Sequence, residues 1–214
     1  MSALDAYLNR LPEGLNSYPE FRQKASVFRD FLRMLDFDRL LPALPNHEMR
    51  QWVQDPPGDN CWISEVHTCA VMAAAVDSCF DDDDGFQDLA FQVHQASLSR
   101  PLYRGLMSLL KPSRVMKLGG STWRFIHEGS SLAVVEVGDR VELILQHPPH
   151  AYCDPMVRAQ AGAFLTVAHL AGQDDAAVSL TQHNEREARF IVDWQGAPAD
   201  DALYVAGPVP RANR

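Results

Sequence analysis

Apolar residues recur with helical spacing through the first two thirds of the chain. Residues 21–35 carry an i, i+3, i+4, i+7 stripe, which predicts an amphipathic helix. Residues 63–80 are rich in Ala and Met and apolar on most sides, which indicates a buried helix. Further helices are expected over residues 86–98 and 101–111, and two short helical pieces over 112–129, divided by adjacent glycines.

The pattern changes near residue 130 from helical spacing to alternation. Residues 131–137 and 140–147 flank Gly138 and Asp139, which predicts a hairpin. A helix is expected after Asp154 and Pro155, and a second hairpin turning near Asn184 follows it. The fold class expected is therefore α+β, with an N-terminal helical block followed by a ββαββ antiparallel-sheet portion.

The chain is expected to form a single α+β domain over residues 1–196. Its helical part covers about 18–128 and its ββαββ part about 131–195. Residues 197–214, with three prolines, are expected to be a loosely ordered tail.

Composition excludes some classes of partner. Hydrophobic residues make up 46% of the 214 residues, enough for a sizeable core. The net charge of -9 argues against binding to nucleic acid or to anionic membranes, since both require a basic surface. The first residues do not resemble a signal peptide, so a cytoplasmic protein with reduced cysteines is expected.

The stretch "HPPHAYCDP" contains the main candidate metal ligands. His147, His150 and Cys153 offer imidazole and thiolate, which zinc accepts, but their spacing matches no zinc motif. The consecutive prolines favour an extended chain that spreads these side chains apart. We therefore expect a strand end followed by a helix start, with a metalloprotein or enzyme that uses these three residues as the alternative.

A resemblance covers about two thirds of the chain. Residues 132–194, from "LAVVEVGDRVELILQHPPHAYCDP" to "EARFIVDW", are similar in order and spacing to the closing half of the heme-NO-binding and 4-vinyl-reductase-like ligand-binding fold. The preceding "PLYRGLMSLLKPSRVMKLGGSTWRFIHEG" resembles the helical lead-in of bacterial relatives without assigned function. The resemblance implies a sensory ligand-binding domain. The chain also resembles, as a further alternative, a stand-alone relative of the ligand-binding domains of AraC-type regulators.

The chain departs from that family in its cofactor motif. Heme-binding members carry a Tyr-x-Ser-x-Arg motif where this chain has "QHPPHAYCD", and neither His94 nor His127 matches a heme motif. No cofactor is therefore expected.

The chain contains no recognisable nucleophile set, phosphate loop or metal motif. We therefore expect a non-enzymatic sensory or adaptor protein that binds a small apolar ligand or a partner protein, and that can form a homodimer. The ligand-binding candidates are adaptable apolar side chains: Met72, Phe91, Met107, Met116 and Trp123.

The metal alternative predicts a measurable difference. Elemental analysis and a visible spectrum of the purified protein are expected to show no stoichiometric zinc or iron and no Soret band. One equivalent of metal that disappears in the His150→Ala variant would instead establish the metalloprotein.

Overall fold

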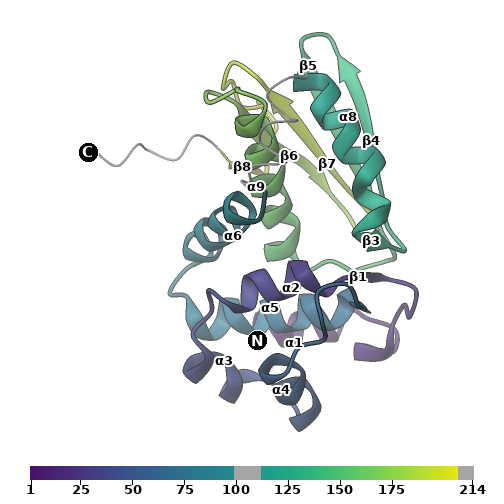
Figure 1. The fold of residues 1–214 in the computed structure, drawn as a ribbon, viewed down its shortest axis with the longest axis vertical. Coiled ribbons are helices and arrows are strands. Elements are labelled where there is room, and N and C mark those ends of the chain that lie inside the picture. Colours follow the sequence, from purple (N-terminus) through teal and green to yellow (C-terminus); the bar gives the residue numbers. More distant parts are fainter. Residues whose placement is uncertain (99–111, 207–214) are drawn as a thin grey trace.

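The structure is a computed structural model that describes residues 1–98 and 112–206 (Figure 1). Its first half is mainly helical, as the periodicity predicts. The segments are α1 (Ala3–Leu8), the 3-10 turn η1 (Gly14–Asn16), α2 (Ala25–Leu32), α3 (Phe37–Ala43), α4 (His47–Gln54), α5 (Glu65–Cys79) and α6 (Asp83–Leu98). Helix α5 is buried along most of its length, because Ala, Val and Met occupy nearly every side of it.

A small antiparallel sheet lies within this helical half. Its order is β2-β1-β3, formed by β1 (Arg22–Lys24), β2 (Trp62–Ser64) and β3 (His127–Glu128). The prediction of helix from residue 21 was therefore wrong for its first turn, and α2 begins only at Ala25. Residues 22–24 form a strand because they pair with two other strands, in a register that places Gln23 between Ile63 and His127.

The second half is a five-stranded antiparallel sheet with helices on its inner face (Figure 1). The sheet order is β4-β5-β7-β6-β8. The segments are α8 (Pro112–Thr122), the 3-10 turn η2 (Trp123–Phe125), β4 (Ser131–Val137), β5 (Arg140–Gln146), α9 (Asp154–Leu170), β6 (Ala177–His183), β7 (Glu187–Asp193) and β8 (Tyr204–Ala206). Helix α9 packs on the sheet and contacts α5, α6 and α8.

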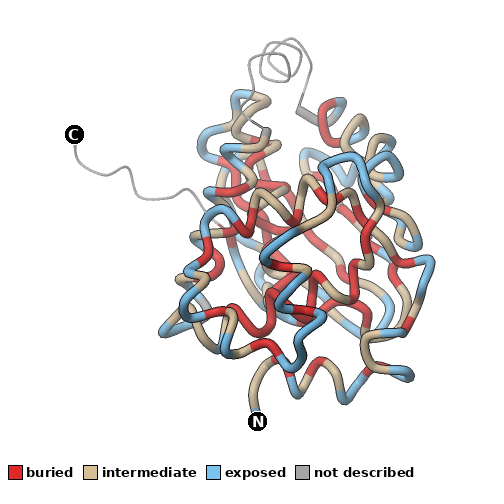
Figure 2. Tube along the Cα trace, turned by 60° about the horizontal axis from the view of Figure 1, so that its bottom comes forward, coloured by how far each residue is buried: buried red, intermediate tan, exposed pale blue. Residues whose placement is uncertain are grey.

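The core is continuous between the two halves. The alternation in β5 buries Val141, Leu143 and Leu145 in the core, while their neighbours in the strand are more exposed. Buried stretches occupy the interior, and exposed stretches surround them (Figure 2). The α+β class, the ββαββ order and the turns at Gly138 and Asn184 are thus confirmed.

Two local predictions differ from the structure. Residues 204–206 of the expected loose tail form β8, which pairs with β6. Helix α8 continues through Gly119 and Gly120 instead of breaking there. A Cβ at Gly120 would lie 2.7 Å from a methyl carbon of Val134, so glycine allows α8 to pack closely on β4. The helix expected over 101–111 lies outside the described residues.

No helix among the described residues is long and apolar enough to span a membrane.

Gly129 joins the two halves at a point where no other residue fits. Its φ of +76° is left-handed, and a Cβ there would lie 2.6 Å from the carbonyl oxygen of Glu20. Gly138, in the β4–β5 turn, has a similar φ of +64° but nothing within 4 Å of the Cβ position. A side chain at Gly138 would therefore meet backbone strain alone, whereas one at Gly129 would meet the same strain and a steric clash.

Alanine substitutions at these glycines test how closely the halves are joined. Gly138→Ala is expected to lower the free energy of unfolding by about 1 kcal/mol, because an L-residue is strained at positive φ. Gly129→Ala is expected to lower it by roughly 3 kcal/mol, since overpacking adds to the same strain. Urea denaturation measures both, and equal losses would contradict the close contact.

Candidate functional site

A fully buried carboxylate, Glu65, lies where the two halves meet. It is the first residue of α5, and the hydroxyl of Ser64 caps the helix by accepting from the backbone N–H of His67. The helix N-terminus offers a positive electrostatic environment that favours a carboxylate. The backbone N–H of Glu65 donates to the carbonyl oxygen of Phe21, which fixes the start of α5 against the turn before β1.

Two side chains donate hydrogen bonds to this carboxylate. The phenol of Tyr152 donates to Oε1 at 2.6 Å. His127 Nδ1 lies 3.1 Å from Oε1 and 3.2 Å from Oε2. A carboxylate only accepts hydrogen bonds, so the ionised form of Glu65 pairs with the His127 tautomer that carries a proton on Nδ1. A buried charge of this kind is tolerated only when such bonds satisfy it.

The environment keeps Tyr152 in its donor form. Burial raises the pKa of Tyr152 well above its ordinary value, and the nearby charge of Glu65 raises this pKa further. The phenol therefore stays protonated at neutral pH and continues to donate to Glu65. Its ring packs edge-on against Phe21, with ring centroids 5.1 Å apart.

Trp123 covers His127. The two rings are stacked with centroids 3.9 Å apart and an interplanar angle of 13°. The indole N–H of Trp123 donates to the hydroxyl of Ser130 at 3.0 Å, which fixes the orientation of the indole. Trp123 is only partly buried, so it is the outermost member of a group that ends at Glu65. We call Glu65, His127, Tyr152 and Trp123 the Glu65 centre.

The Glu65 centre connects three segments that are distant in the sequence. Glu65 comes from α5, His127 from β3, and Tyr152 from the residues that precede α9. Tyr7 of α1 adds a nearby bond, since its hydroxyl donates to the carbonyl oxygen of Ala151 at 2.6 Å. The centre therefore holds both halves in one arrangement.

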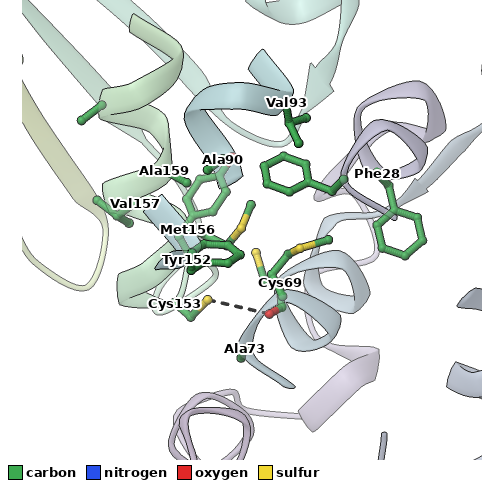
Figure 3. Close-up of a cluster of buried hydrophobic side chains, with 14 of the residues drawn as sticks. Phe28, Cys69, Ala73, Ala90, Val93, Tyr152, Cys153, Met156, Val157 and Ala159 are labelled. Atoms are coloured by element: carbon green, nitrogen blue, oxygen red, sulfur yellow. Dashed lines mark hydrogen bonds between the residues drawn. The ribbon is translucent and has the colours of Figure 1, made fainter. Parts of the chain in front are cut away.

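Two thiols lie in the adjoining core. Cys153 donates weakly to the backbone oxygen of Cys69, at 3.7 Å, and both side chains are buried (Figure 3). Burial raises the pKa of the Cys69 thiol well above its ordinary value, and contact with Cys153 adds to the rise. Cys69 is therefore a protonated thiol and a poor nucleophile at neutral pH.

The three residues of the "HPPHAYCDP" hypothesis have separate partners. His147 Nδ1 bonds the carbonyl oxygen of Pro148 at 2.9 Å, and His150 Nε2 lies 3.4 Å from Glu185. The Cys153 thiol points toward Cys69 instead. No group of three or more His, Cys, Asp or Glu among the described residues is arranged to hold a metal ion.

His147 also lines an open hollow beside the β6–β7 turn. Gln146, Asn184, Arg186 and Glu187 form the rest of its lining. His147 is 7% exposed, and burial lowers its pKa, so the ring is neutral at neutral pH. Its Nε2 is buried with no hydrogen-bond partner among the described residues. Because Nδ1 donates to Pro148, Nε2 of the neutral ring can accept from a further donor.

The predicted ligand-binding residues lie on several elements. Met72 of α5 and Met116 of α8 are buried in the core, whereas Phe91 and Trp123 are partly buried at its edge. Phe91 packs against α9, edge-on to His169 with ring centroids 6.0 Å apart. Met107 lies outside the described residues, so a shared pocket for the five stays a prediction.

The two histidines considered for heme differ in setting. His94, on α6, packs edge-on against Phe31, and burial lowers its pKa to about 4, with His127 as a second cause. His127 is on a strand, not on a helix as its sequence context indicated, and it bonds Glu65 through Nδ1.

Sequence reasoning missed Glu65 and Tyr152 as members of one site. The available signal was a glutamate at the start of an otherwise apolar helix, where a carboxylate is stabilised by the helix N-terminus. Its partners are 62 and 87 residues away in the chain, and no periodic pattern links residues at such separations. Comparison with family models, with curated proteins and with solved structures found no match.

Replacing the two buried tyrosines tests the carboxylate of the Glu65 centre. Tyr152→Phe is expected to lower the free energy of unfolding by about 2 kcal/mol, because it removes a bond to a charged acceptor. Tyr7→Phe is the matched control and is expected to cost about 1 kcal/mol, since its acceptor is a neutral carbonyl. Chemical denaturation compares them, and a smaller loss for Tyr152→Phe would contradict a charged Glu65.

Proposed function

We propose that the protein is a non-enzymatic sensory or adaptor protein, and that it binds an apolar ligand or an apolar segment of a partner at Trp123. The observation that carries the proposal is the exposure of the residues that follow the indole. Phe125 is 63% exposed and Ile126 is 39% exposed. Large apolar side chains that gather at the surface are typical of binding sites.

The location of Trp123 supports a signalling role. An apolar molecule that contacts the indole can change the stacking on His127, and His127 is bonded to Glu65. A shift of His127 alters a bond shared by α5 and, through Tyr152, by the start of α9. Binding at one surface would thereby change how the two halves are held together, provided the ligand favours one of two arrangements.

The chemistry of the Glu65 centre also favours binding over catalysis. Glu65 orients His127, as a carboxylate does in many catalytic pairs. Here, however, Glu65 also accepts a hydrogen bond from Tyr152, and the indole of Trp123 stacks on His127. In the adjoining core, burial raises the pKa of the Cys69 thiol and keeps it protonated. This arrangement holds an imidazole in place and supplies no activated nucleophile.

The setting proposed for this function is the cytoplasm. The net charge of -9 favours a protein partner with a basic surface, because complementary charge accelerates and orients association.

Native mass spectrometry and a fluorescent probe test the proposal together. The purified protein is expected to carry a copurifying apolar molecule or to bind anilinonaphthalene sulfonate in its folded state. Trp123→Ala is expected to weaken probe binding about tenfold, a change of about 1.4 kcal/mol. Near-ultraviolet circular dichroism must show that the variant keeps its native packing.

Trp62→Ala is the matched control for this experiment. Trp62 lies on β2, at the edge of the small sheet opposite β3, with the ammonium of Lys24 4.0 Å from its ring centroid. Binding is expected to survive in this variant. Equal weakening in both variants, or no binding by the folded wild-type protein, would refute the proposed site.

A further inference from the structure

Strand β4 forms one edge of the five-stranded sheet. It has seven residues and pairs with β5 along its whole length, in a register without a bulge. Its other edge has no partner strand in the part of the chain that the structure describes. A free edge presents N–H and C=O groups that can pair with another strand.

The core is incomplete at this edge. Leu132 and Val134 face inward but stay only partly buried, whereas the β5 residues opposite them, Leu145 and Leu143, are 0% exposed. Helix α8 packs closely over Val134 at Gly120, yet it does not complete the burial. The inner apolar layer of the sheet therefore reaches the surface along β4.

The outer face of β4 is apolar as well. Val135 is 42% exposed and Val137 is 52% exposed. The strand contains no proline, no lysine and no bulge, three of the features that commonly protect an edge. Its one charged residue, Glu136, lies 3.1 Å from the ammonium of Lys117 on α8.

We propose that β4 pairs antiparallel with β4 of a second copy of the chain, about a two-fold axis at Val134. This register places Ser131 opposite Val137 and Ala133 opposite Val135, so a small side chain meets a larger one at each outer pair. It places Glu136 opposite Leu132, which keeps the two like charges from facing each other directly.

The two-fold axis is perpendicular to the sheet, so each face continues across both copies. Val134 of one copy then lies beside Val134 of the other, with Leu132 of each copy diagonally across from it, and both α8 helices lie on the inner side. The interface is isologous, as in most homodimers. It does not depend on ligand binding at Trp123.

Sedimentation velocity over micromolar to hundred-micromolar concentrations tests the pairing. The wild-type protein is expected to sediment as a dimer at the upper concentrations, and Val135→Lys as a monomer, because it places two lysines near the axis. Val205→Lys is the matched control, since Val205 is 40% exposed on the other edge strand, β8, and it is expected to stay dimeric. A wild-type protein that is monomeric throughout would overturn the proposal.

A disulfide trap tests the register. Val134→Cys, in a Cys61→Ser background that removes the exposed native thiol, is expected to form a disulfide-linked dimer under mild oxidation. Val205→Cys in the same background is expected to stay unlinked. Linkage only through Val205→Cys, or a Val135→Lys variant that remains dimeric, would place the interface elsewhere and refute β4 pairing.

Discussion

The buried carboxylate of Glu65 is the constraint on which the arrangement of the two halves depends. A charge with no exposure to water must be compensated locally, and here a phenol and an imidazole from distant segments provide the compensation. The same requirement fixes the start of α5, the position of β3 and the residues before α9. Gly129 then allows the chain to leave β3 in contact with the backbone of Glu20 and Phe21.

This constraint also gives the proposed function a physical basis. Trp123 is the partly buried, outermost member of a group that ends at the buried carboxylate of Glu65. Under the proposed function, contact at the surface would act through His127 on Glu65, which also accepts the bond from Tyr152 that joins the halves. A buried ionic group contributes little net stability compared with an apolar replacement, but breaking it is costly. Such a group suits a protein that must hold one arrangement until a ligand or partner changes it.

The sequence predicted what local patterns determine. Alternation predicted β5 and its buried face, and Gly138 and Asn184 predicted the turns, because side-chain period and turn chemistry act over a few residues. It failed at Arg22–Lys24, where pairing with β2 and β3 overrides the helical stripe. It also focused on His147, His150 and Cys153, which are close in sequence but have separate partners. Glu65, His127 and Tyr152 were not grouped, because only the folded chain brings them together.

Hydrogen exchange in a Glu65→Gln variant tests whether the buried carboxylate holds the two halves together. A glutamine side chain has nearly the same size but no charge, and its amide group replaces one of the two carboxylate oxygens that face His127 Nδ1. The bonds from Tyr152 and His127 then lose the contribution of a charged acceptor and are weakened. If Glu65 holds these segments together, protection is expected to fall simultaneously in the first turn of α5, in β3 and in residues 151–153. A loss confined to α5, with β3 and residues 151–153 as protected as in the wild-type protein, would contradict it.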